Sequence, residues 1–207
     1  MAKKYLSTTG VDEFYYAVLN TAQTAAEGAP ERVKFLQEIT VSAPQEIVKA
    51  YGDNKVAEMA TSNGVVEVSG AFHKLPIEDR NVLLGLETTS GGLSSYGSTD
   101  NPPYVAAVFA KTHEDGSKEW VGLPKGKFIK PEQTATSKQD SVEFSSDEIT
   151  AEFMDREVTG FSDEKSVIFG VDEKGKTTSR DALFTAVFGK ACPGADRKST
   201  RLNSSHD

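Results

Sequence analysis

The chain has 207 residues and carries 31 acidic against 23 basic side chains, a formal net charge of −8. This length allows one domain with a sizeable core, or one domain with an appendage. An acidic chain lacks the positive surface that neutralises phosphates, which excludes a tight grip on nucleic acid, although such a chain can line a channel through which DNA slides.

Strands and one long excursion are predicted for the first third of the chain. Residues 32–42 (RVKFLQEITVS) place two apolar pairs at strand spacing with an irregularity between them, namely Val33 with Phe35 and Ile39 with Val41. Residues 43–63 form a polar excursion containing Pro44, Gly52 and Asp53-Asn54. Loops longer than about 12–15 residues are uncommon without a function, and an ordinary surface loop stays open as the alternative.

A strand over residues 64–72 is expected to lead into a short helix. Pro76 opens this helix, with Glu78 and Asp79 in the first turn, where the helix dipole favours negative charge. The apolar face of the helix is predicted to comprise Val82, Leu83 and Leu86. This face is wide enough to lay the helix across a sheet.

A hairpin is predicted after a Gly/Ser-rich loop over residues 87–103. Its strands are 104–111 and 119–129, and Asp115-Gly116 between them is typical of a tight turn that needs positive φ. The aromatic side chains of this hairpin are interpreted as core or cross-strand packing, namely Tyr104, Phe109 and Trp120.

Two segments within residues 133–153 (QTATSKQDSVEFSSDEITAEF) alternate apolar and polar side chains. This alternation predicts two strands, each with one buried and one solvent-facing side. In the first segment Val142 and Phe144 flank Glu143, and in the second Ile149, Ala151 and Phe153 flank Thr150 and Glu152. A further strand over 167–171 and a helix over 179–188, capped by Ser179, are predicted to follow.

Strands joined by hairpins, with only two short helices, predict a mainly β fold. The expected architecture is an antiparallel β-sandwich or partly closed barrel with a flanking short α-helix. No signal-peptide core follows Met1 and no stretch approaches the length of a membrane span, so no membrane association is expected. The lone Cys192 cannot form an internal disulfide, which fits a reducing cytoplasm, and we interpret it as a passive thiol.

One motif points in another direction. Residues 170–177 (GVDEKGKT) satisfy the phosphate-loop pattern GxxxxGK[ST] between a strand-like and a helix-like run. However, Asp172 and Glu173 would place carboxylates in a cradle for phosphate anions. Too little chain follows for the strand that supplies a magnesium-binding acid, and the alternating strand–helix pattern of a parallel sheet is missing. A polar hairpin with Gly175 at its turn is the preferred interpretation.

No other residue pattern predicts catalysis or metal binding. His73 and His113 have no metal-ligand spacing to each other or to Cys192, and the many carboxylates are scattered, which is typical of a solvated face. We therefore assign no catalytic, cofactor-binding or metal-binding residue, expect no cofactor, and expect that the protein is not an enzyme.

Four segments resemble, in order, the major tail tube proteins of long, non-contractile phage tails (the phi-thirteen type). They are TTGVDEFYYAVL (8–19), NGVVEVSGAFHKLPIEDRNVLLGL (63–86), NPPYVAAVFAKTHEDGSKEWVGLPKGKF (101–128) and KQDSVEF followed by ITAEF within 133–153. The resemblance covers residues 8–153 well and 161–190 more loosely. It implies a single tail-tube-like domain over residues 1–190, with 161–190 as a C-terminal strand and helix extension.

The resemblance also implies a structural function. Such subunits form rings of six that stack into a hollow conduit for DNA ejection, which duplex DNA crosses without specific binding, and the excursion 43–63 would be a loop that reaches the neighbouring ring. The implied partners are further copies, the tape measure protein, and the tail tip and tail terminator proteins. The implied location is the virion tail, after synthesis in the host bacterial cytoplasm. The alternative is a non-catalytic decoration or β-sandwich adhesion module.

Residues 196–207 break from the acidic chain before them. DRKSTRLNSSH (196–206) is what one reading frame of a common sequencing adapter gives when translated, so we interpret 196–207 as an artefact and expect the native chain to end a little beyond Ala195. A disordered basic tail is the alternative. Without this segment the charge is 20 minus 29, or −9.

Overall fold

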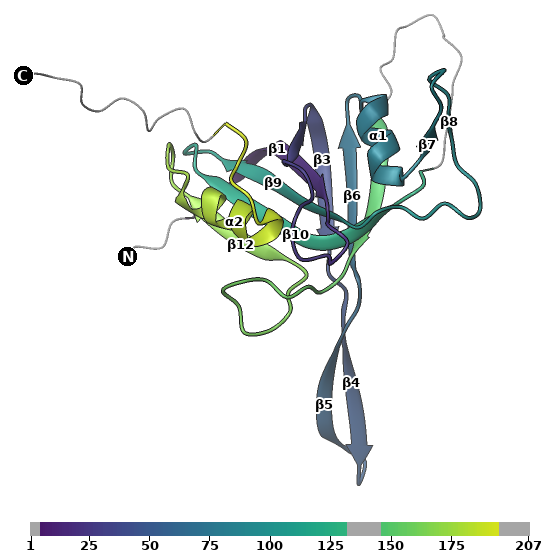
Figure 1. Ribbon diagram of the computed structural model, residues 1–207. Coiled ribbons are helices and arrows are strands. Elements are labelled where there is room, and N and C mark those ends of the chain that lie inside the picture. The colour runs from purple at the N-terminus through teal and green to yellow at the C-terminus, as the bar shows by residue number, and fades with distance from the viewer. Residues whose placement is uncertain (1–4, 132–145, 195–207) are drawn as a thin grey trace, which may run out of the picture.

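The structure is a computed structural model that describes residues 5–131 and 146–194. Within these ranges it is mainly antiparallel β-sheet with two helices (Figure 1). The main sheet has the order β2-β1-β9-β10-β11-β6-β3, and β12 pairs with β10 off this path. Its strands are β1 Thr8–Val18, β2 Glu31–Val33, β3 Leu36–Ser42, β6 Val66–Phe72, β9 Val105–His113, β10 Lys118–Ile129, β11 Asp147–Phe153 and β12 Ile168–Asp172.

Two helices and two small sheets complete the described chain. The helices are α1 Ile77–Leu84 and α2 Thr178–Phe188. The small sheets are the hairpin of β4 Gln45–Gly52 with β5 Lys55–Asn63, and the pair β7 Glu87–Thr88 with β8 Ser94–Ser95. The mainly β, antiparallel fold with a short flanking helix is confirmed.

Strand β9 divides two hydrophobic cores, because side chains alternate across a strand and both faces of β9 are covered. Val105, Ala107 and Phe109 face the core enclosed by the curled sheet, where β1 contacts β3 and α1 closes one side. Ala106, Val108 and Ala110 face the second core, between the sheet and α2. The continuous apolar run of β9 therefore reflects burial on both sides.

The predicted strands are largely confirmed. Residues 32–42 break at Phe35, whose φ of 65° separates β2 from β3. In β11 the side chains of Ile149, Ala151 and Phe153 are buried and those between them are exposed, as predicted. The first predicted segment, around Glu143, lies outside the described residues.

The helix that Pro76 opens begins at Ile77, but its apolar face differs from the prediction. Leu83 and Leu84 are buried, whereas Val82 is 44% exposed, so placing Val82 on the packed face was wrong. The helix is so short that a small rotation, set by the sheet beneath it, decides which side chains are covered. The predicted loop over 87–103 contains the short strands β7 and β8.

The excursion 43–63 is a β-hairpin rather than a loop. Asp53 and Asn54 both have positive φ, 49° and 63°, which is the geometry of a tight hairpin turn. At the base, the Gly64 N–H donates to the Pro44 carbonyl at 2.9 Å. The hairpin projects from the body, away from both cores (Figure 1).

Candidate functional site

The phosphate-loop motif (170–177) contains the end of β12 and a turn that leads into α2, so the predicted polar hairpin was wrong, although Gly175 does lie in the turn with a φ of 80°. The buried Asp172 carboxylate accepts hydrogen bonds from the backbone N–H groups of Ser179 (2.8 Å) and Arg180 (2.9 Å). N–H groups at the start of a helix can bind an anion such as phosphate. Here a carboxylate of the chain itself occupies that position.

The lysine of the motif, Lys176, forms an ion pair within the turn. Lys176 Nζ lies 2.7 Å from the carboxylate of Glu173, on the exposed side of the turn. Ser179, predicted as the helix cap, instead donates from its hydroxyl to the Val171 carbonyl at 2.8 Å, and Thr177 occupies the N-cap position without a side-chain cap bond. Strand β12 therefore caps α2 through Asp172, a contact that local sequence rules do not predict.

The other residues weighed for catalysis are not brought together into a metal site. Among the residues described, no group of three or more His, Cys, Asp or Glu side chains could hold a metal ion. Cys192 is 4% exposed and packs in the core beneath α2, where burial raises the pKa of its thiol. A thiol with a raised pKa is a weak nucleophile, because the thiolate is the reactive form.

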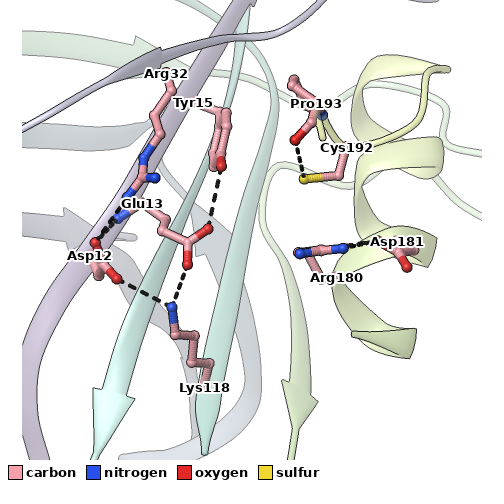
Figure 2. A network of polar contacts seen from close by, with 9 residues as sticks. All are labelled: Asp12, Glu13, Tyr15, Arg32, Lys118, Arg180, Asp181, Cys192 and Pro193. Carbon is pink, nitrogen blue, oxygen red and sulfur yellow. Dashed lines mark hydrogen bonds and ion pairs between the residues drawn. The ribbon is translucent and has the colours of Figure 1, made fainter. Parts of the chain in front are cut away.

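A polar network that the sequence did not reveal lies beside α2 (Figure 2). Lys118 on β10 donates to Asp12 at 3.2 Å and to Glu13, and the Tyr15 hydroxyl donates to Glu13 at 3.3 Å. Glu13 has a φ of 54° at a bulge in β1, which turns its side chain toward Lys118. In the sequence, the only indication of this network was the adjacent Asp12-Glu13 pair inside the otherwise apolar segment that forms β1.

The pKa values of Tyr15 and Lys118 in this network favour a structural role over proton transfer. Burial and the Glu13 carboxylate raise the pKa of Tyr15 to about 12. Burial lowers the pKa of Lys118, but the hydrogen bonds that its ammonium donates to Glu13 and Asp12 outweigh burial and leave the pKa raised. The Tyr15 phenol and the Lys118 ammonium therefore keep their protons at neutral pH, and the hydrogen bonds of this network connect β1 to β10.

The β4–β5 hairpin is the most exposed part of the described fold. Every residue of β5 is exposed, and large apolar side chains remain uncovered, with Tyr51 71%, Ile47 64% and Met59 64% exposed. An isolated two-stranded hairpin is marginally stable in water. The hairpin is therefore the feature of this fold that most needs a partner surface.

The fold is an antiparallel β-body with a capped flanking helix and a projecting hairpin whose apolar side chains are exposed. The family model for phage tail tube proteins matches residues 39–192, from β3 through the hairpin and α2 to Cys192. The chain belongs to the phage tail tube protein family. A search of curated proteins found no match.

Family membership makes the chain a structural component of the virion that assembles into a tube with other phage tail proteins. The match contains the phosphate-loop letters, which places them within a tail tube fold. No helix in the described ranges is long and apolar enough to cross a membrane.

Proposed function

We propose that residues 1–190 act as one tail tube subunit that closes into rings of six, and that the rings stack into a hollow conduit for DNA ejection. The β4–β5 hairpin carries this proposal, because it places uncovered apolar side chains beyond the body of the subunit. The eight residues of β4 span roughly 26 Å at the usual rise of a strand. This reach suits contact with a neighbouring ring.

The charge of the chain supports passage of DNA without retention. Residues 1–195 have a net charge of −9, and duplex DNA carries one negative charge per roughly 1.7 Å. A lumen that attracted phosphates would hold the genome, so acidic side chains outnumber basic ones on the lumenal wall. Purified tubes then fail to retain duplex DNA at physiological salt, and a predominantly Lys/Arg lumen in the assembled ring contradicts this proposal.

The tube grows around the tape measure protein and ends at the tail tip and tail terminator proteins, with assembly in the host bacterial cytoplasm. A decoration or β-sandwich adhesion module is the second candidate. The hairpin discriminates between them, because a tube subunit requires it for stacking and an isolated module does not.

Negative-stain electron microscopy of the concentrated protein tests the proposal. We expect rings or tubes whose number rises with protein concentration. Protein that stays monomeric at high concentration, even when the tape measure and tail tip proteins are supplied, contradicts the proposed function.

A further inference from the structure

The register of the hairpin, with its shift between Ala50 and Tyr51, places most of the large apolar side chains on one face. Tyr51 pairs with Val56, Lys49 pairs with Met59, and Ile47 lies on the same side of β4 as Lys49 and Tyr51. We call Ile47, Tyr51, Val56 and Met59 the apolar stripe; they are 64%, 71%, 46% and 64% exposed. The opposite face carries Val48, which is 57% exposed, among small or charged side chains, with the pairs Glu46–Ser62, Val48–Ala60 and Ala50–Glu58.

A groove on the body offers a matching surface. It has a volume of about 530 Å³ and lies between the end of β3, the base of the hairpin and β12. Its apolar lining includes Ile39, Val41, Val121, Val167 and Phe169. We call this the β12 groove.

Strand β12 beside this groove is also uncovered. In the described part of the chain β12 pairs with β10 alone, and its outward-facing Phe169 and Val171 are 63% and 62% exposed. A strand edge with exposed apolar side chains invites pairing or cover by another chain.

The stripe cannot fill the groove of its own chain. Ala43 and Asn63, where the hairpin starts and ends, are themselves part of the groove lining, and the hairpin runs away from the body (Figure 1). The groove lining carries two acidic and two basic side chains, Asp155, Glu164, Lys111 and Lys165. The two lysines already pair with Glu119 (3.8 Å) and Asp163 (3.9 Å), which leaves Asp155 and Glu164 to face Lys49 of the stripe. None of these three side chains forms an ion pair in the ranges that the structure describes.

We propose that the apolar stripe of one subunit docks in the β12 groove of a second copy of this chain. The inference rests on the proposed tube function and adds which face of the hairpin is buried and what receives it. Docking covers the stripe, the groove and the outward side chains of β12 together, and it places Lys49 near the carboxylates of Asp155 and Glu164.

Disulfide cross-linking in assembled tubes tests the proposal. The variant carries Met59→Cys on the stripe and Ser166→Cys in the groove lining, and the matched control carries Glu58→Cys on the opposite face with the same Ser166→Cys. A disulfide needs Cα atoms within about 7 Å of each other. We expect covalent dimers and higher species from the first variant under mild oxidation, and only the background of the single-cysteine variants, which also contain Cys192, from the control.

A second variant asks whether the groove is needed. Phe169→Asp should lose both the cross-link and tube growth, whereas Phe161→Asp, at an exposed aromatic outside the groove lining, should retain both. Tubes that form without the Met59–Ser166 cross-link, or that grow normally with Phe169→Asp, overturn the docking site and leave the tube function standing. If the wild type forms no tubes, the proposed function fails and the docking site fails with it.

Discussion

The carboxylate of Asp172 lies 2.8 Å from the backbone nitrogen of Ser179, seven positions later in the chain. The last residue of β12 therefore caps the helix α2, which begins at Thr178. The second oxygen of the same carboxylate accepts a hydrogen bond from the backbone N–H of Arg180 at 2.9 Å. One buried side chain therefore satisfies two N–H groups that the helix cannot satisfy itself. The contact ties the start of α2 to the end of β12.

Asp172→Ala should destabilise the subunit by about 1–2 kcal/mol, because two helix N–H groups lose a charged acceptor. The free energy of unfolding from denaturant titration measures this loss. Glu173→Ala, which changes the exposed neighbouring carboxylate, is the control and should unfold like the wild type. A wild-type midpoint for Asp172→Ala would show that the cap contributes little.

Lys176→Ala should leave folding and tube formation unchanged, because Lys176 is exposed and pairs only with the exposed Glu173 among the described ion pairs. Isothermal titration calorimetry with ATP or GTP should give no binding heat for either protein, since Asp172 occupies the helix N–H groups. Micromolar nucleotide binding by the wild type that is lost in Lys176→Ala would contradict our interpretation of the motif.

Gly122→Ala should loosen α2 from the sheet. A Cβ at Gly122 would lie 2.7 Å from Val187 Cγ2 and 2.9 Å from Leu183 Cδ1, so these side chains or the helix that carries them must move, at a cost of about 1–3 kcal/mol. Thermal unfolding followed by the fluorescence of Trp120, which packs against Phe184, reports the change.

Gly70→Ala is the control for Gly122→Ala. A Cβ at Gly70 would make only ordinary contacts, the nearest at 3.6 Å to Ile149. This substitution should cost much less stability than Gly122→Ala. Equal losses for the two variants would indicate that the extra methyl group acts through strand propensity rather than through contact with α2.

Asp147 should make stability depend on acid pH. Burial raises the pKa of its carboxyl, but the Leu75 N–H (2.9 Å) and the Lys74 ammonium (3.0 Å) outweigh burial and hold the pKa below its usual value. Because the folded pKa is depressed, the stabilisation is present above the unfolded value of about 3.9 and is lost as pH falls through the folded pKa.

Asp147→Asn should therefore be less stable than the wild type at neutral pH and should lose less stability on acidification. Denaturant unfolding at a series of pH values from neutral to strongly acidic measures both effects. Glu148→Gln, at the exposed next position of β11, is the matched control for removing a carboxylate from this strand. If the free energy of unfolding changes with pH in the same way for Asp147→Asn and the wild type, the Asp147 carboxylate is not the cause of the acid sensitivity.

Replacing residues 45–63 by a two-residue Asn-Gly turn should remove stacking without unfolding the body. Pro44 and Gly64 are already joined by a hydrogen bond at the hairpin base, so a short turn can close the gap. Electron microscopy should show no long tubes, although single rings can persist, while the melting transition remains cooperative. Val48→Thr, on the face opposite the apolar stripe, should still form tubes, and normal tubes from the shortened chain would refute the assigned role of the hairpin.

Local patterns in the sequence determined most of the strands. Alternation predicted β11, with Ile149 and Phe153 inside, and Asp115-Gly116 marked the turn between β9 and β10, where Gly116 has a φ of 78°. Such signals work because side-chain alternation and positive φ are properties of a few neighbouring residues. The ordered resemblance of four segments then predicted the family, which the match over residues 39–192 confirms.

The tertiary structure decided what depends on contacts between distant residues. Whether GxxxxGK[ST] binds phosphate or caps its own helix depends on where the Asp172 carboxylate lies relative to Ser179, and spacing in the sequence does not fix that position. Residues 43–63 were predicted as a loop because the stretch is polar and contains Pro44, Gly52 and Asp53-Asn54. They form a hairpin whose one apolar face becomes visible only when the register pairs Tyr51 with Val56 and Lys49 with Met59, since pairing across two strands decides which side chains share a face.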